Sequence, residues 1–469
     1  MAPSERERSE GLIGMLQRRL DRRDFLRVMA WSGSAAGLAA FLQACGVTTT
    51  PTPGATATGT AQPTGTAAAG RTIKLGYVSP KTGPIASFAE ADDFIFSGVK
   101  AAWGAGIQIG DTVHPVEILA KDTQSDPARA AQVAGELIAD GIDLMLVAST
   151  PETTNPVSDQ CEANGVPSVS TVAPWQPWFI ARQANPADPA SWKEFTWTYH
   201  FFWGLEDIIA VFLDMWSQID TNKKIGAIWP NDGDGNAWGD PVVGFPPAFA
   251  NAGYSLIDPG RYQNLTDDFS AQIGQFKTGG VEIITGVPIP PDFTTFWTQA
   301  NQQGFKPKAA SIGKALLFPA SVKALGADLG DGLSTEVWWS PSHPFSSSLT
   351  GDSSKALADA YTAATSNQWT QPIGFAHALF EVATDVLKRA TSIEDKASIR
   401  DAIAATNLET IVGKLAWTGQ PNKNVAKTPL VGGQWGKSAD TASGYELTIV
   451  SNADHPEIPK AGSLRPIGG

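Results

Sequence analysis

The sequence predicts an α/β protein made of two doubly wound lobes, and three observations carry this prediction. The chain has 469 residues, which is more than one ordinary hydrophobic core organises. Strand-like and helix-like segments alternate over residues 73–147, and the alternation restarts over residues 225–303. Because alternating strands and helices build mostly parallel sheets, each series predicts one lobe.

The first series begins with a predicted strand at 73–78, a helix at 91–103 and a strand at 116–119. The next helix is predicted from Asp126 and Pro127, since Asp caps helices well and Pro fits the first turn. Its apolar residues recur at the spacing of one helix face, namely Ala130, Val133, Ala134, Leu137 and Ile138. The continuously apolar segment 144–147 then predicts a strand that is covered on both faces.

The second series and the C-terminal part follow the same alternation. Strands are predicted at 225–229 and 281–285, and helices near 242–252, 267–277 and 293–303. Three later helices, near 353–365, 376–389 and 395–405, are expected to return to the first lobe. A last pair of strands, around 430–434 and 445–450, closes the chain.

Residues 1–44 predict an export signal rather than a part of the fold. Arg22 and Arg23 precede an apolar stretch at 28–42, a pattern that resembles the twin-arginine export signal of bacteria. A plain transmembrane anchor is the alternative. The stretch has only about 15 residues, however, whereas roughly 20 are needed to span a bilayer.

The apolar stretch ends in Leu42-Gln43-Ala44-Cys45, which resembles the lipobox of bacterial lipoproteins. The resemblance implies that Cys45 is lipidated and becomes the first residue of the mature chain. Residues 45–70 are rich in Thr, Pro, Ala and Gly and contain no charged residue, which predicts a flexible tether. We therefore expect a protein that is lipid-anchored to the outer face of the cell membrane, or periplasmic.

Composition and missing motifs argue against several function classes. The 34 basic and 47 acidic residues give a net charge of −13, which disfavours nucleic-acid binding, because that binding depends on Lys and Arg at phosphates. Two cysteines and five histidines without ligand spacing predict no metal site and no cofactor. The sequence has no Gly-x-Ser-x-Gly or His-Glu-x-x-His motif, so no catalytic residue is assigned and a secreted hydrolase is kept only as a rival interpretation.

The segment 232–239 nearly matches two known loops. It begins like a calcium-binding loop, but Ala237 and Val243 stand where that loop needs Gly and Glu. It also begins like a dinucleotide-binding loop, but the third glycine, Gly239, comes one residue late. Neither site is therefore predicted.

Three segments resemble the branched-chain-amino-acid type of periplasmic binding protein, the substrate-binding subunits of ATP-driven (ABC) importers. They are residues 76–86, which contain a Thr-Gly-Pro loop after the first strand, residues 268–280 and residues 302–307. The resemblance covers residues 73–417. It implies the type I periplasmic binding protein fold, in which a three-crossing hinge joins two Rossmann-like lobes and the ligand is trapped between them.

The resemblance also implies the division of the chain. Crossings are expected near 199–203, 336–341 and 411–417. Lobe 1 then comprises residues 71–200 and 340–412, and lobe 2 comprises residues 201–339 and 413–469. The ligand cleft is expected at the carboxyl ends of the strands, where open α/β sheets bind ligands.

Ligand contacts are carried over from the family residue by residue. Ser149 and Thr150 follow a predicted strand and precede a helix start, so their hydroxyl and N–H groups are expected to hold a carboxylate; alternatively, they only cap that helix. Trp175, Trp203 and Trp238 are expected to line the cleft, with packing in the core as the alternative. The expected contacts are Phe88, Ser149, Thr150, Ala173, Trp175, Trp203, Trp238, Val287, Pro288 and Lys314.

Lys314 carries the sharpest expectation. Amino-acid binders of the family have an acidic residue here that pairs with the ammonium group of the ligand, whereas this chain has a cation. Because a buried lysine repels an ammonium group, the sequence predicts a carboxylate ligand without an amine, and the Trp residues favour an aromatic one. The alternatives are that Lys314 points to solvent, or that the ligand is an amino acid, an amide or a sugar.

These expectations describe a monomeric protein that binds a small molecule and catalyses no reaction. Its expected partners are the permease and ATPase subunits of an ABC importer, together with the membrane through the lipid anchor. A ligand-sensing domain on the same scaffold is the alternative from a different functional class.

Overall fold

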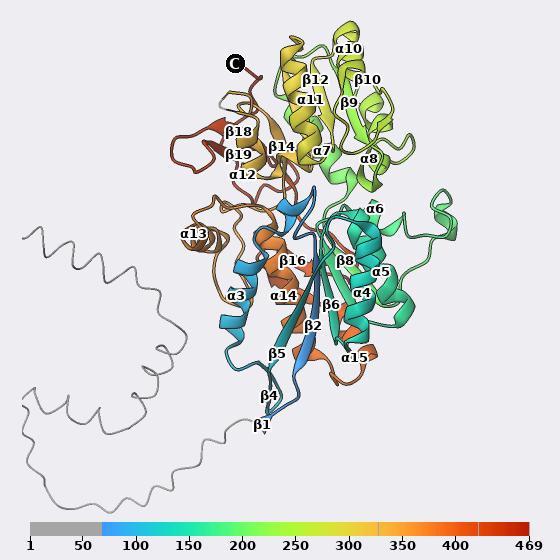
Figure 1. The fold of residues 1–469 in the computed structure, drawn as a ribbon, viewed down its shortest axis with the longest axis vertical. Helices are drawn as coiled ribbons and strands as arrows, with labels where there is room; N and C mark the ends of the chain where they lie inside the picture. The colour runs from blue at the N-terminus through green and yellow to red at the C-terminus, as the bar shows by residue number, and fades with distance from the viewer. Residues whose placement is uncertain (1–67, 327, 421, 469) are drawn as a thin grey trace, which may run out of the picture. The chain divides into compact units, whose positions relative to one another are not determined.

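The structure is a computed structural model that describes residues 68–326, 328–420 and 422–468. The expected export signal, Cys45 and the tether up to residue 67 lie outside the described residues. Within the part of the chain that is described, no helix is both long and apolar enough to cross a bilayer. The folded body is divided between two large β-sheets, one in each lobe (Figure 1).

The first lobe is built on a six-stranded parallel sheet with the strand order β17-β8-β7-β6-β2-β5. Its strands are β2 (Ile73–Ser79), β5 (Val116–Asp122), β6 (Leu144–Ala148), β7 (Ser168–Thr171), β8 (Thr198–Phe201) and β17 (Val425–Ala426). Helices α3 (Asp92–Trp103) and α14 (Pro372–Arg389) cover one face, and α4 (Pro127–Ala139) and α5 (Pro151–Asn164) cover the other.

Strand β6 shows why this layered arrangement forms. Leu144 and Leu146 pack into the apolar cluster that includes α3 and α14, whereas Met145 and Val147 pack into the cluster of α4 and α5. Successive side chains of a strand point to opposite faces, so a continuously apolar strand needs a cover on both sides. The predicted doubly covered strand at 144–147 is confirmed.

The second lobe is built on an eight-stranded sheet with the order β10-β9-β12-β13-β14-β18-β19, and β11 also pairs with β9. Its strands are β9 (Lys224–Pro230), β10 (Ser255–Ile257), β11 (Arg261–Tyr262), β12 (Ile283–Gly286), β13 (Ala309–Ile312), β14 (Ser334–Val337), β18 (Val431–Lys437) and β19 (Tyr445–Ser451). The predicted C-terminal strand pair is confirmed, because β18 and β19 extend the parallel part as an antiparallel pair.

The other helices are shorter or lie at the edges of the lobes. Those of the second lobe are α7 (Leu205–Ser217), α8 (Gly233–Trp238), α9 (Phe245–Asn251), α10 (Ser270–Gly279), α11 (Pro290–Gln302) and α12 (Pro319–Ala324). Three further helices are α6 (Trp175–Phe179), α13 (Ser354–Thr365) and α15 (Lys396–Ala404). A small sheet is formed by β1 (Ala68–Ala69), β3 (Ile107–Ile109) and β4 (Thr112–His114), and a hairpin by β15 (Asn407–Thr410) and β16 (Gly413–Ala416).

The chain passes between the two sheets three times. It leaves the first sheet after β8, returns after β14 and leaves again after β17. The third crossing was expected near 411–417, and this expectation is wrong. Strand β17 still pairs with β8, so the crossing lies between Ala426 and Val431, and residues 413–420 and 422–426 belong with the first lobe. Trp417 helps to hold them there, since its Nε1 donates a hydrogen bond to the carbonyl oxygen of His200 at 3.1 Å.

The helix predicted near 242–252 is confirmed, although it begins a few residues later than predicted. The structure has α9 over part of this range, preceded by the unpredicted helix α8. Glycines disfavour a helix at α8, but Asp232 caps its first turn by accepting a hydrogen bond from the Gly235 N–H at 2.8 Å. This cap fixes a short helix that buries Asp234 and Trp238.

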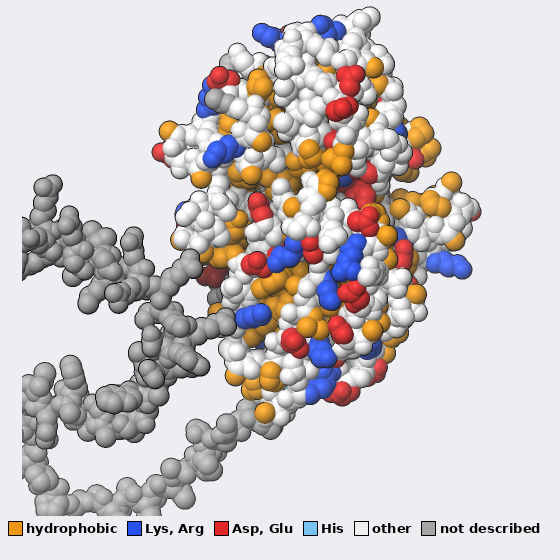
Figure 2. Space-filling model, viewed as in Figure 1, with side chains coloured by type: hydrophobic (Ala, Val, Ile, Leu, Met, Phe, Trp, Pro, Cys, Tyr) orange, Lys and Arg blue, Asp and Glu red, His pale blue; other side chains and the backbone are white. Residues whose placement is uncertain are grey.

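Surface charges are mixed on the face that Figure 2 shows. Lys and Arg side chains are interspersed with Asp and Glu side chains over the first lobe. Ion pairs of this lobe include Lys121 with Glu136, whose charged atoms lie 3.0 Å apart. On this face, the basic side chains therefore do not form a single continuous patch.

Candidate functional site

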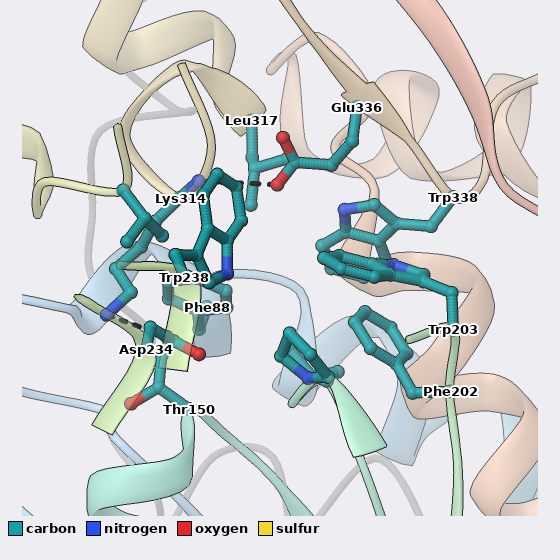
Figure 3. A pocket seen from close by; sticks show the side chains of 13 residues that line it. Phe88, Thr150, Phe202, Trp203, Asp234, Trp238, Lys314, Leu317, Glu336 and Trp338 are labelled. Carbon is teal, nitrogen blue, oxygen red and sulfur yellow. Dashed lines mark hydrogen bonds and ion pairs between the residues drawn. The ribbon is translucent and has the colours of Figure 1, made fainter. Parts of the chain in front are cut away.

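A small cavity lies between the two lobes (Figure 3). It is found at the carboxyl ends of the strands, because Thr150 comes just after β6, Val287 follows β12 and Trp338 follows β14. Open α/β sheets bind their ligands at this edge. The wall consists of Phe88, Thr150, Val172, Pro174, Phe202, Trp203, Asp234, Trp238, Val287, Lys314, Leu317, Glu336 and Trp338.

The structure brings together part of the expected contact set. The expected residues that line the cavity are Phe88, Thr150, Trp203, Trp238, Val287 and Lys314. Thr150 occupies the N-cap position of α5, but its side chain makes no capping hydrogen bond. The helix-cap alternative therefore does not account for the Thr150 hydroxyl.

The other expected contacts, Ser149, Ala173, Trp175 and Pro288, are not part of the cavity wall. The Ser149 hydroxyl shares a hydrogen bond with Thr153 inside α5. The carbonyl oxygen of Ala173 accepts a hydrogen bond from Nε2 of His200 at 2.7 Å. Trp175 lines a separate pocket, together with Phe179 and Glu206.

Aromatic rings form much of the cavity wall and are held by other rings. The centroid of Phe202 lies 4.9 Å from that of Trp203 and 5.2 Å from that of Trp338. Trp238 stacks on Phe245 with a centroid separation of 4.6 Å. Such contacts stabilise each ring in one orientation. The two interpretations of Trp203 and Trp238, core packing and cleft lining, thus both hold.

Several hydrogen-bond donors of the wall are buried without a partner among the described residues. They are Nε1 of Trp203, Trp238 and Trp338, and the hydroxyl of Thr150. An indole N–H can only donate, and a hydroxyl can donate or accept. Because buried polar groups in folded proteins are nearly always paired, a ligand with acceptor atoms would supply the missing partners.

Lys314 is buried, and its ammonium group lies among carboxylates. Its Nζ is 2.8 Å from Oδ2 of Asp234, 3.2 Å from Oδ2 of Asp232 and 4.0 Å from Oε1 of Glu152. Burial by itself lowers the pKa of Lys314, but these three carboxylates raise it well above its ordinary value, so the lysine is charged.

This geometry corrects both expectations about Lys314. The lysine does not point to solvent, since its side chain is only 3% exposed. It also does not present a free positive charge to a ligand, because its Nζ points to Asp234 (Figure 3). The predicted repulsion between Lys314 and a ligand ammonium group therefore loses its basis.

Asp234 and Glu336 are the acidic groups of the cavity wall. Burial raises the pKa of each to about 7, and for Asp234 the charge of Lys314 opposes the increase. Glu336 accepts hydrogen bonds from the backbone N–H of Lys314 at 3.3 Å and from the Thr335 hydroxyl at 3.0 Å. Oδ1 of Asp234 is buried and makes no hydrogen bond within the described ranges. The wall can therefore accept a hydrogen bond from a ligand and change its charge near neutral pH.

Glu152 links the two lobes directly. It stands in the first turn of α5 in the first lobe, and its Oε1 accepts a hydrogen bond from the backbone N–H of Gly233 at 2.9 Å. Gly233 begins α8 in the second lobe. A Cβ atom at Gly233 would lie 3.2 Å from the same oxygen, so the glycine permits this close approach.

Sequence reasoning missed Phe202, Asp234, Leu317, Glu336 and Trp338 as cavity residues. Asp234 was noticed only within a failed calcium-loop pattern, although its carboxylate binds an ammonium group here. Among the described residues, no cluster of His, Cys, Asp and Glu side chains suited to a metal ion is found. Trp338 directly follows a strand, and this position is the signal that could have identified it.

Two of three comparisons place the chain among known proteins. Residues 72–440 match the family model described as periplasmic binding protein. The fold is similar to that of a leucine binding protein from Thermotoga maritima, with a TM-score of 0.63 and 18% identity over 81% of this chain and 99% of that one. No match was found among curated proteins.

Two further solved structures carry ligands. A branched-chain amino acid transporter substrate binding protein from Streptococcus pneumoniae, in complex with isoleucine, has a TM-score of 0.63 and 16% identity over 81% of this chain and 99% of its own. A solute binding protein of an ABC transporter from Rhodopseudomonas palustris, in complex with 3,4-dihydroxybenzoic acid, has the same TM-score and 16% identity over 81% of this chain and 96% of its own. With a family match over most of its length and this shared architecture, the chain belongs to the periplasmic binding protein family and has the type I periplasmic binding protein fold.

Proposed function

We propose that this protein is the extracytoplasmic substrate-binding subunit of an ABC importer and captures a small organic ligand between its lobes. The observation that carries the proposal is the cavity at the carboxyl ends of both sheets, with buried and unpaired donors in its wall. Each unpaired buried donor costs on the order of 1–3 kcal/mol. A ligand that accepts these hydrogen bonds would therefore stabilise the protein with both lobes around it.

The donors support a ligand that carries an acceptor group, and a carboxylate is the group that the sequence predicted. Thr150 and the indoles of Trp203 and Trp338 are available to such a group. The similar proteins bound to isoleucine and to 3,4-dihydroxybenzoic acid both hold carboxylic acids. The aromatic rings of the wall can also pack against a planar or apolar part of the ligand.

We propose that the protein lies outside the cytoplasm and is attached to the membrane. Residues 1–44 would direct export by a twin-arginine-like signal, Cys45 would carry the lipid and residues 45–70 would act as the tether. The partners would be a permease and its ATPase subunits, and the protein itself would bind and release its ligand without chemistry. Replacement of Cys45 by Ser is expected to abolish lipid labelling and to move the protein from the membrane to the soluble fraction.

Ligand capture is tested on the purified mature protein. Native mass spectrometry identifies a small molecule that co-purifies, and small-angle scattering compares the particle with and without it. We expect a smaller radius of gyration with ligand, because the lobes close on it. An unchanged radius at saturation contradicts capture between the lobes. A protein that closes but does not stimulate the ATPase of its transporter is a sensor instead.

A further inference from the structure

The acidic groups around the cavity outnumber the basic ones. The ammonium group of Lys314 lies near three carboxylates, those of Asp232, Asp234 and Glu152. Glu336 is a fourth carboxyl group, and no Lys or Arg of the described residues forms an ion pair with it. Buried carboxylates without full compensation favour a positive charge nearby. The second-lobe side of the cavity is therefore suited to a cationic group.

Some acceptor sites on this side are already occupied. Oδ2 of Asp234 accepts from Lys314, and the two oxygens of Glu336 accept from the Lys314 backbone and from Thr335. Oδ1 of Asp234 is the carboxylate oxygen of the wall that makes no hydrogen bond to a described residue. A primary ammonium group has three N–H donors to satisfy. Each carboxylate oxygen can accept two hydrogen bonds, so this side keeps acceptor sites for either kind of nitrogen, and the choice of an alkylated nitrogen rests on the aromatic part of the wall.

The rest of the wall is aromatic. Phe88, Phe202, Trp203, Trp238 and Trp338 contribute rings to the cavity wall, and Trp238 and Phe88 lie close to Asp234 (Figure 3). Aromatic faces attract organic cations, and quaternary ammonium groups are recognised by rings of this kind together with few hydrogen bonds. Rings and carboxylates in one small cavity thus complement an alkylated cation in both shape and charge.

We propose that the ligand is a small organic cation or zwitterion whose positive charge is an alkylated nitrogen, seated between the aromatic rings and the carboxyl groups of Asp234 and Glu336. This inference rests on the proposed function and names its ligand class. In a zwitterion, the carboxylate would face Thr150 and the unpaired indole donors. The small size of the cavity limits the ligand to a small molecule.

The test uses matched pairs of probes that differ only in alkylation of the nitrogen. Glycine betaine is compared with glycine, and choline with ethanolamine, by calorimetric titration and by Trp fluorescence of the mature protein. We expect each trimethylated probe to bind about tenfold or more tightly than its primary-amine partner. Equal or tighter binding of the primary amines, or no binding of either trimethylated probe at millimolar concentration, overturns the inference.

Isoleucine and 3,4-dihydroxybenzoate are titrated in parallel to separate this inference from the proposed function. If one of them binds and compacts the particle while the trimethylated probes do not bind, capture between the lobes stands and the alkylated cation is wrong. If no probe binds and no small molecule co-purifies, both proposals are wrong.

Variants test the two parts of the site separately. Glu336→Gln and Asp234→Asn are each expected to weaken choline binding about tenfold. Asp359→Asn, an exposed acid on α13, removes the same charge at a distance and is expected to leave choline binding unchanged. Asp234→Asn removes a partner of the Lys314 ammonium group, and Glu336→Gln alters an acceptor of the Lys314 backbone N–H, so melting curves check that both variants fold. Unchanged choline binding by both folded variants contradicts the inference.

The aromatic part is tested at Trp338. Trp338→Phe keeps a ring and loses the N–H, whereas Trp338→Leu loses the ring. Choline binding is expected to survive the first change and to fall about tenfold with the second. Equal effects of the two changes on choline, with both variants folded, contradict a cation held by aromatic faces.

Discussion

The two sides of the cavity contrast in their polar groups. On the first-lobe side, Thr150 presents an unpaired hydroxyl beside aromatic rings, within the described part of the chain. On the second-lobe side, Lys314, Asp234 and Glu336 form a buried network of charges. One side thus offers neutral hydrogen bonds and apolar contact, and the other sets the charge of the cavity. The lobes therefore contribute different parts of ligand recognition.

The largest expected effect comes from removing the cation of the second-lobe side. Lys314→Met leaves the carboxylates of Asp232 and Asp234 buried without their partner. We expect a loss of about 3–5 kcal/mol in the free energy of unfolding, because breaking one half of a buried ion pair leaves an uncompensated charge.

Urea unfolding at pH 8 measures this loss. The matched control is Lys81→Met, which breaks a more exposed pair with Asp93 and is expected to change stability by about 0–1 kcal/mol. Similar small effects for both variants would show that the charges of the second-lobe side are not coupled as the structure indicates.

The second prediction concerns pH. Burial raises the pKa of Glu336 to about 7 in the folded protein from an ordinary value of 4.5. The folded state therefore binds a proton more tightly than the unfolded state, so this group stabilises the fold below about pH 4.5 and its contribution is lost as pH rises through 7. The groups that face Glu336 are Lys314 and Thr335.

Glu336→Gln is expected to remove this part of the pH dependence. Unfolding free energies are measured from pH 5 to pH 8 for both proteins. Relative to wild type, the variant is expected to gain on the order of 2 kcal/mol between these limits. Parallel curves for the two proteins contradict the buried position of the Glu336 carboxyl group.

The third prediction addresses the link between the sides. Glu152→Gln weakens the contact with Gly233 N–H and removes a charge near Lys314. We expect a larger radius of gyration without ligand and an affinity for the co-purified molecule that is weaker by about fivefold, or ~1 kcal/mol. Glu162→Gln on the same helix is the control, because Glu162 accepts hydrogen bonds from Thr196 within the first lobe. Equal radii for all three proteins would mean that Glu152 does not hold the lobes together.

The smallest effect on stability is expected on the first-lobe side. Thr150→Val removes a hydroxyl that has no partner in the described residues, so the free energy of unfolding without ligand is expected to change by less than about 1 kcal/mol. Ligand affinity should fall about fivefold if the hydroxyl binds the ligand. Thr154→Val gives the opposite pattern, because its hydroxyl donates to the Ser149 carbonyl oxygen at 2.8 Å inside the fold. Unchanged affinity of the Thr150 variant removes this residue from the site.

Local sequence signals predicted many of the longer strands and helices, but not elements such as β7, β8 and β14. The cap at Asp126, whose side chain accepts from the Arg129 N–H at 2.7 Å, and the apolar segment at β6 are examples. Both signals act over a few residues, through hydrogen bonds to the next turn or through alternation of side chains. Helix α8 was missed because its Gly-rich sequence has weak propensity and depends on the Asp232 cap. Strand β17 was missed because two residues carry no periodicity.

By itself, the sequence determined the two strand–helix series and the edge at which a ligand would lie, because these follow from local periodicity and from the geometry of parallel sheets. It did not determine the charge of the site. Lys314 and Asp232 are separated by 82 positions in the chain, and Glu152 reaches them from the other lobe. The interaction of charges depends on distance and burial, and only the tertiary structure sets both. The lysine that was predicted from the sequence to exclude an ammonium ligand is therefore the partner of three carboxylates.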